Sequence, residues 1–334
     1  MSVASAWAEP AALMAWYPEL NSPAGRAWID LLIQNGMLVV EGTPAAAIDA
    51  DYEQFWKWDT TAGFYHFALK DPPYMTTPQA AQWMAACGAT QAEVPLYSTN
   101  AGYPTVIDLP APRTGEGMLE ILNRRRSVRA FSRREISTAA LGDCLYAGLG
   151  ITGFLDTQIV GSRRLPLKMT PSGGARNPYE GYAYVNRVAG IRRGLYHYSA
   201  TENSLGLLTE KPGVSVSELL VGQSWGDDCS AVVLLAANFE RTMWKYPSAV
   251  AYRVVLIEAG HIAQNISIAA ASHGLTTTPT AALNDSAAHR LLRLDWIRQS
   301  LVYAIQVGYA EPDAFEYRNF IPWSPRRGGP EGPG

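Results

Sequence analysis

The stretch that most constrains the fold of this chain runs from Ser248 to Leu275 and is apolar around nearly its whole circumference. Its pattern predicts one long helix, and a helix without a polar face is normally buried in the core of a domain or a dimer. A membrane span would not carry as many polar groups at its centre as this stretch does: Arg253, Glu258, His261, Gln264 and Asn265. We therefore expect a buried helix at a dimer interface.

Composition argues against several classes of partner. The net charge of −3 gives no reason to expect a nucleic acid or an anionic membrane. Only 17% of the 334 residues are charged, which favours additional buried surface such as an oligomer interface. The three cysteines and five histidines show no disulfide or metal-ligand spacing. The N-terminus lacks the pattern of a signal peptide, so we expect a cytoplasmic protein.

From about residue 116 the pattern is α+β. Two alternating segments around the turn region 186–193 predict a β-hairpin, and two later apolar runs predict further strands. Ser137 is a suitable N-cap for a helix. The expected helices span 118–126 and 137–149, and the expected strands span 181–185, 194–198, 230–239 and 301–309.

The first 110 residues are rich in Trp, Tyr and Ala and differ from the rest. Residues 25–37 predict an amphipathic helix, and Val39–Val40 predict a short strand after it, as in a small winged-helix-like unit. The proline-rich run Leu109–Arg113 predicts a linker. We therefore expect an accessory region over 1–112 and a second domain over 113–334.

One familiar motif is rejected. Gly148–Gly153 fits the dinucleotide-binding pattern G-x-G-x-x-G. It follows a predicted helix rather than a strand, and no acidic residue stands about 20 residues further on. The glycines are better explained as the end of that helix.

Two segments could bind an anionic ligand. Arg124–Arg129 holds four arginines and a serine in six positions, and guanidinium groups pair well with phosphate. Pro171–Pro178 is a loop of small residues whose backbone amides could approach a ligand closely. Taken alone, the first could be a solvated basic patch and the second an ordinary turn.

Lys245 and Tyr246 are the candidate acid–base pair. They precede Pro247 and the long helix, and proline is favoured in a first helical turn. The positive end of a helix dipole disfavours an ammonium group and favours a phenolate, which suits proton acceptors. A surface lysine beside a packed tyrosine remains the alternative.

Taken together and in order, these elements resemble the nitroreductase superfamily over about residues 116–327. The shared motifs are Arg-Arg-Ser-x-Arg-x-Phe, Pro-Ser-Gly-Gly-Ala, Gly-Leu-Tyr-His-Tyr (194–198), Lys-Tyr, Tyr-Arg (252–253), Gly-His-Ile-Ala-Gln-Asn (260–265), Gly-Leu (274–275), Pro279 and Val-Gly-Tyr (307–309). The Lys-Tyr pair resembles more narrowly the flavin-dependent azoline dehydrogenases, which make thiazoles and oxazoles.

The resemblance implies a nitroreductase-like fold, with a central mixed or antiparallel sheet and surrounding helices, and a homodimer with FMN at the subunit interface. It implies that Lys245 and Tyr246 are catalytic. It also implies three sets of FMN contacts: phosphate, ribityl and ring-edge contacts from Arg125, Arg126, Ser127 and Arg129; a loop from the partner subunit formed by Pro171, Ser172, Gly173 and Gly174; and a loop at flavin N5 formed by Pro279, Thr280, Ala281 and Ala282. A C-terminal cation, Arg326 or Arg327, completes the phosphate contacts.

The chain departs from the family in two places. Thr280–Ala282 stand where the family often has glycines, and a methyl there could narrow the substrate slot. The N-terminal region is short for a leader-peptide-binding domain, which leaves carrier-bound or small cyclic substrates open besides ribosomal peptides.

The expected activity is FMN-dependent oxidation of an azoline or another C–N bond in a natural-product intermediate, with dioxygen reoxidising the flavin. The alternatives are an NAD(P)H-dependent nitro- or quinone reductase, in which the Lys-Tyr pair has no role, and a non-catalytic flavin-binding or adaptor protein.

Overall fold

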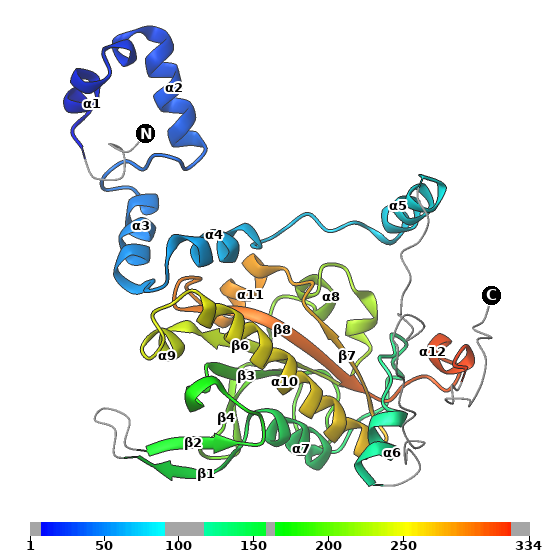
Figure 1. Ribbon diagram of the computed structural model, residues 1–334. Helices are drawn as coiled ribbons and strands as arrows, with labels where there is room; N and C mark the ends of the chain where they lie inside the picture. The colour runs from blue at the N-terminus through cyan, green and yellow to red at the C-terminus, as the bar shows by residue number, and fades with distance from the viewer. Residues whose placement is uncertain (1–7, 91–116, 158–163, 322–334) are drawn as a thin grey trace, which may run out of the picture. The chain divides into compact units, whose positions relative to one another are not determined.

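The computed structural model describes residues 8–90, 117–157 and 164–321 (Figure 1). The chain divides into two compact units, Met1–Asp59 and Thr60–Gly334. This division groups residues 60–90 with the larger unit, whereas the sequence assigned them to the accessory region. The expected linker Leu109–Arg113 lies outside the described residues, so the boundary at residue 112 stays a prediction.

The smaller unit is helical. Its elements all begin with a proline, which has a backbone preset for a first helical turn, and the side chains of Ser22 and Thr43 cap the two longer helices. The elements are α1 (Pro10–Trp16), η2 (Pro18–Asn21), α2 (Pro23–Gln34) and α3 (Pro44–Phe55). Residues 8–59 contain no strand, so the predicted strand at Val39–Val40 and the winged-helix-like interpretation are wrong. Two β-branched residues in an exposed connection are too few to form a sheet.

The larger unit is built on a six-stranded antiparallel sheet with the strand order β5-β4-β3-β6-β8-β7. Every strand predicted from alternation is present, and the predicted hairpin pairs Gly181 with Tyr198. A separate hairpin joins β1 and β2. The strands are β1 (Ile151–Asp156), β2 (Arg164–Lys168), β3 (Tyr179–Val185), β4 (Gly194–Ser199), β5 (Ser204–Thr209), β6 (Ala231–Asn238), β7 (Thr276–Thr280) and β8 (Gln299–Gly308).

Helices and short 3₁₀ turns surround this sheet. The predicted cap is confirmed, since the Ser137 hydroxyl accepts the Ala140 amide at 3.1 Å. Gly150 ends α7, and β1 follows, so the rejected glycine motif does sit behind a helix. The elements are α4 (Thr60–Ala68), α5 (Thr77–Thr90), α6 (Gly117–Arg124), α7 (Thr138–Leu149), η3 (Gly173–Ala175), α8 (Val216–Leu219), η4 (Ser224–Asp227), α9 (Phe239–Met243), α10 (Val250–Ser272), α11 (Asp285–Leu292) and α12 (Phe315–Arg318).

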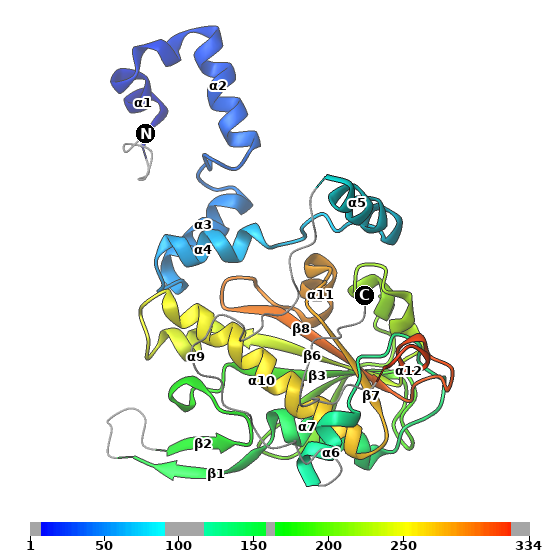
Figure 2. The ribbon, with the colours of Figure 1, turned by 45° about the vertical axis from the view of Figure 1, so that its right-hand side comes forward.

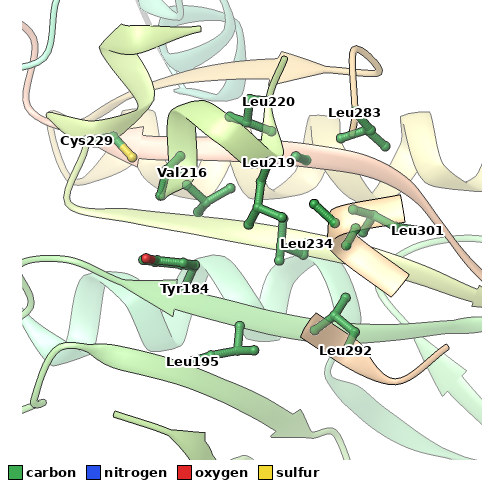
Figure 3. Close-up of a cluster of buried hydrophobic side chains, with 14 of the residues drawn as sticks. Tyr184, Leu195, Val216, Leu219, Leu220, Cys229, Leu234, Leu283, Leu292 and Leu301 are labelled. Atoms are coloured by element: carbon green, nitrogen blue, oxygen red, sulfur yellow. The ribbon is translucent and has the colours of Figure 1, made fainter. Parts of the chain in front are cut away.

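Apolar side chains fill both faces of the sheet. On one face, α8 and α11 pack over the inward side chains of β3, β6 and β8, and this cluster is shown in Figure 3. On the other face lie α7 and α10, which pack against each other where Gly148 meets Ile262 and Ile266. A β-carbon at Gly148 would stand 2.7 Å from Ile266, so the glycine permits the close approach of the two helices.

The long helix predicted from Ser248 to Leu275 is confirmed as α10, which begins two residues later, at Val250, and ends three residues earlier, at Ser272. Within the described residues, α10 has the length and hydropathy of a membrane-crossing helix, and half of this apolar window is buried inside the protein. The prediction that Pro247 occupies its first turn is wrong, because Ala249 is the N-cap. A helix dipole acts mainly within the first turn, so it does not account for Lys245.

Candidate functional site

The arginine segment is held at the edge of the sheet beside β7. The Thr276 hydroxyl donates to the Arg126 carbonyl at 2.8 Å, and the Thr278 hydroxyl donates to the Val128 carbonyl at 2.6 Å. Val128 is fully buried, whereas the arginines on either side of it are half-buried or exposed. The segment is therefore fixed by its backbone and one apolar anchor, which leaves its polar side chains at the surface.

The side chains of this segment differ in how they are engaged. Arg125 Nη1 lies 3.4 Å from Ser127 Oγ, and no carboxylate of the described residues pairs with Arg125. Arg126 donates to backbone carbonyls and stacks 3.9 Å from the ring centre of Phe320. Arg129 pairs with a carboxylate, that of Glu316, at 3.6 Å. Arg125 and Ser127 are thus the members best placed to receive an anion.

The glycine loop adopts a strained backbone. Gly174, Ala175 and Asn177 have φ angles of 61°, 54° and 47°, in the left-handed region that residues other than glycine rarely occupy. At Ala175 and Asn177 this conformation costs on the order of 1–3 kcal/mol each, and strained residues of this kind cluster at active sites and ligand clamps. The Asn177 side chain offsets part of this cost by donating to the Pro166 and Ala175 carbonyls, both at 2.9 Å.

Lys245 and Tyr246 lie directly on this loop. Lys245 Nζ is 3.5 Å from the Gly174 carbonyl oxygen. A β-carbon at Gly174 would stand 2.3 Å from Tyr246 Oη and 2.7 Å from Lys245 Nζ. One at Gly173 would stand 2.7 Å from Val254 in α10. Close approach of Val254 favours glycine at position 173, and the positive φ of 61° favours glycine at position 174, which the Lys245 and Tyr246 side chains contact.

An ionic network fixes the loop from the side of the sheet. Arg241 pairs with Glu180 and donates to the Asn177 carbonyl at 3.0 Å. His197 adds a second contact to Glu180 at 3.0 Å. Burial alone would raise the pKa of the Glu180 carboxyl, but Arg241 and His197 together hold it below its ordinary value. The network joins α9, which precedes Lys245, to the end of the loop.

A buried carboxyl fixes the loop from the side of α10. Glu258 is only 4% exposed, and the Ser172 hydroxyl and Gly173 amide both hydrogen-bond to it. Burial raises the pKa of Glu258 from 4.5 to about 6, against the opposing effect of these bonds and of Lys168. The Ser172 oxygen in turn accepts the Asn177 amide at 2.8 Å. Glu258 therefore acts as the support of Ser172 and Gly173.

The raised pKa of Glu258 predicts how stability depends on pH. Because the folded-state value lies above the unfolded value, the contribution of this group to stability is fully present below pH 4.5 and is lost as pH rises through about 6. The shift corresponds to about 2 kcal/mol. We expect Glu258→Gln to remove this decline in urea midpoints measured between pH 4 and 8. The exposed control Glu240→Gln should keep the wild-type profile. Parallel profiles for Glu258→Gln and the wild type would contradict this role.

Of the predicted loop Pro279–Ala282, the first two residues are the end of strand β7, and only Ala281 and Ala282 follow the strand. The Thr280 hydroxyl oxygen accepts the Ala282 amide at 3.1 Å and the Gln223 side chain at 3.0 Å. Ala281 is exposed, and its carbonyl accepts the Tyr74 hydroxyl at 3.3 Å. The loop is thus tied to its own strand and to the segment that follows α4. The predicted phosphate contacts Arg326 and Arg327 lie outside the described residues.

Within one chain, the predicted site residues form two groups. Lys245, Tyr246 and the glycine loop lie near α9 and the start of α10, whereas the arginine segment follows α6 near the end of α10 (Figures 1 and 2). Since α10 has 23 residues, its ends are about 34 Å apart. A single chain therefore does not place the arginine segment beside Lys245.

Sequence reasoning missed the supports of the loop. From the sequence, Glu258 was interpreted only as a polar interruption of an apolar helix. A single acidic residue on such a helix indicates a specific buried partner. Arg241 and Glu180 gave no sequence signal, because strand pairing and the α9 turn bring them together.

The chain is 31% identical over 193 residues to the putative nitroreductase MJ1384 of Methanocaldococcus jannaschii, covering 56% of this chain and 90% of that protein. It is 31% identical over 145 residues to the trifolitoxin-processing protein TfxB of Rhizobium leguminosarum bv. trifolii, covering 42% of this chain but only 39% of that protein.

Two of the solved structures that match are the following. A chain of the E. coli microcin synthetase McbBCD complex with truncated pro-MccB17 bound has a TM-score of 0.50 and 16% identity, covering 78% of this chain and 97% of that chain. A putative nitroreductase in complex with FMN from Desulfovibrio desulfuricans has a TM-score of 0.39 and 19% identity, covering 58% of this chain and 87% of that chain.

The model of the nitroreductase family matches residues 122–309, which include the arginine segment, the glycine loop, the Lys245–Tyr246 pair and the loop after β7. The match confirms the expected family, and the structure shows an α+β fold with an antiparallel sheet and a helical N-terminal region. This chain belongs to the nitroreductase family.

Proposed function

We propose that this flavin oxidoreductase is an FMN-dependent dehydrogenase that oxidises an azoline to an azole. The observation that carries the proposal is the contact of the Lys245 and Tyr246 side chains with Gly174. A reductase that only passes electrons from a nicotinamide to its substrate needs no base at carbon. A lysine and a tyrosine held against a strained cofactor loop suit proton removal from carbon.

The residues present fit FMN. Arg125 and Ser127 offer a guanidinium and a hydroxyl to a phosphate, with the backbone of their segment fixed by Thr276 and Thr278. Gly173 and Gly174 keep the opposite loop free of β-carbons. We assign the loop Pro279–Ala282 to the flavin N5 position. When bound, FMN supplies the two-electron acceptor for the hydride that leaves the substrate.

The site is completed in a homodimer. The exposed side of α10 carries Val250, Val254 and Ile257, of which the first and last are 61% and 51% exposed. Positions three and four residues apart share one helix face, so these side chains form an apolar stripe suited to a second copy. Since the two groups of site residues lie near opposite ends of α10, we assign the glycine loop, Lys245 and Tyr246 to the partner of the subunit whose arginines hold FMN.

The chemistry assigned to the protein is proton transfer. In an azoline, Lys245 or Tyr246 takes the proton from the ring carbon beside the imine nitrogen, and that electron pair forms the new ring double bond as hydride departs from the neighbouring carbon. Positioned acid–base groups typically contribute about 10²–10⁴-fold to rate. The Gly174 carbonyl beside Lys245 Nζ orients the lysine.

The substrate we propose is a peptide-derived or carrier-protein-bound heterocycle in natural-product biosynthesis, oxidised in the cytoplasm. Support comes from two relatives by their own descriptions, one a trifolitoxin-processing protein and one a chain of a synthetase complex with a precursor peptide bound. The second candidate, an NAD(P)H-dependent nitro- or quinone reductase, is favoured by the similarity to MJ1384.

The two candidates separate in one assay series. FMN-loaded protein is supplied either with NADPH and a nitroarene or with 2-phenylthiazoline-4-carboxamide in air. We expect turnover of the thiazoline and negligible oxidation of NADPH. Rapid NADPH oxidation without thiazoline turnover would replace the proposal with the reductase function, and no turnover of either at full FMN occupancy would indicate a non-catalytic flavin protein.

We expect the Arg125 side chain to strengthen FMN binding. Arg125→Ala removes one charged donor beside Ser127, and a hydrogen bond to a charged group contributes about 1.5–3 kcal/mol. We expect the FMN dissociation constant, measured by flavin fluorescence titration, to rise by roughly 10–150-fold. The control Arg133→Ala removes an exposed arginine that pairs with Asp228 and should leave FMN affinity unchanged. Equal affinity of Arg125→Ala and the wild type would place the phosphate elsewhere.

A further inference from the structure

A cavity of about 490 Å³ lies within the larger unit, beside the loop that follows β7. Its walls come from α4 and the segment after it, from α10, and from the start of β8. Ligand pockets for small molecules typically span about 300–1,000 Å³. Five aromatic side chains line it: Tyr65, Tyr74, Tyr252, Trp296 and Tyr303.

The segment 60–76 forms one wall and is anchored by buried and capping contacts. His66 bonds through one ring nitrogen to Tyr252 Oη and through the other to the Trp296 carbonyl, both at 2.9 Å. Asp71 accepts the Ser286 amide at 3.1 Å, while its own amide donates to Asp285 at 3.1 Å. The wall is therefore held at both ends, so the cavity has a defined shape.

The cavity adjoins the predicted flavin loop. Ala281 lines it, and the Tyr74 hydroxyl donates to the Ala281 carbonyl at 3.3 Å. Gly260 on α10 also lines it, and a β-carbon there would meet nothing within 4 Å. A ligand in the cavity would thus lie next to the loop assigned to flavin N5.

The charged groups on its walls are already engaged. Lys70 Nζ lies 3.5 Å from the ring centre of Trp296, which is itself stacked 3.3 Å from His289. Asp285 accepts the Asp71 amide. Burial lowers the pKa of His66, the histidine among the lining residues, which favours its neutral ring. What remains for a ligand is aromatic and aliphatic surface with a few phenol groups, which suits an uncharged flat ring.

We propose that this cavity binds the substrate ring, an uncharged five-membered C=N heterocycle with an apolar neighbour, and that α4 and Tyr74 make it selective for such rings. The proposal rests on the proposed function, because it places the reacting ring beside the flavin loop. Residues 60–76 then have a direct part in specificity.

The test narrows the cavity from opposite walls. Leu69, which is 46% exposed, is replaced by Trp, and Val302 on β8 is replaced by Phe. Leu208→Trp on β5, 44% exposed and outside the cavity, is the matched control. The probes are 2-phenylthiazole-4-carboxamide for calorimetric binding and 2-phenylthiazoline-4-carboxamide for turnover. FMN occupancy and thermal melting are measured for each variant.

We expect both cavity variants to raise the dissociation constant of the thiazole and the KM of the thiazoline at least 10-fold, with FMN content unchanged and the control like the wild type. If the wild type binds the thiazole through the cavity but oxidises no thiazoline, the proposed function fails while the cavity assignment stands. Turnover with unaltered KM and affinity in both folded variants would overturn the cavity assignment alone. Loss of FMN from both variants would show that the cavity binds the cofactor, and this result would also overturn its assignment to the substrate ring.

Discussion

Lys245→Ala and Tyr246→Phe should each slow flavin reduction by a thiazoline by roughly 10²–10⁴-fold, the usual contribution of a positioned acid–base group. Both side chains contact the space over Gly174 and neither is in the buried core, so fold and FMN content should be retained. The measurement is the rate of loss of oxidised-flavin absorbance after anaerobic mixing with substrate.

Three controls make this result specific. Reduction of the same variants by dithionite should be unchanged, because it requires no proton removal from carbon. Lys211→Ala and Tyr317→Phe, which alter an exposed lysine and an exposed tyrosine elsewhere, should behave like the wild type. The double variant should lose less than the product of the two single losses, since residues that act as a unit are not additive. Wild-type rates in both single variants would show that the pair is not the base.

Two inactive variants should restore activity when they share a dimer. In the assigned arrangement, one subunit supplies Arg125 and Ser127 to a site whose Lys245 comes from the partner. A mixed dimer of Lys245→Ala with Arg125→Ala/Ser127→Ala therefore has one intact site and one doubly altered site. With two symmetric sites per dimer, we expect about half of the wild-type rate, from parents that are each nearly inactive.

The mixed dimer is isolated by two different affinity tags, and light scattering establishes its size. A pure mixed dimer no more active than its parents would place both groups of residues in one subunit's site. A folded, FMN-loaded monomer at micromolar concentration would contradict the dimer itself.

The sequence predicted those parts of the fold that have a local pattern. Strand alternation located β3 and β4, and apolar runs located β6, β8 and α10, because the pattern of apolar residues reports directly which side chains are buried. The strand predicted at Val39–Val40 was wrong because β-propensity without a pairing partner carries little information. The prediction that Pro247 lies in the first turn of α10 was wrong because proline is also common in the turns that precede a helix.

The sequence identified several residues of the site but not the contacts between them. Motif order identified the arginine segment, the glycine loop and the Lys245–Tyr246 pair as candidates, but the contact between Gly174 and that pair exists only in three dimensions. The support from Glu258 and the cavity beside Ala281 depend on residues far apart in the chain. No local pattern connects His66 to Tyr252, so residues 60–76 could not be assigned to the site from sequence.

The most direct test of the account is a single anaerobic turnover of FMN-loaded protein with 2-phenylthiazoline-4-carboxamide. We expect the flavin to become fully reduced and one thiazole, two hydrogen atoms lighter than the thiazoline, to form for each flavin reduced. A flavin that stays oxidised with the thiazoline at saturating concentration, yet is reduced at once by NADPH, would contradict the dehydrogenase function.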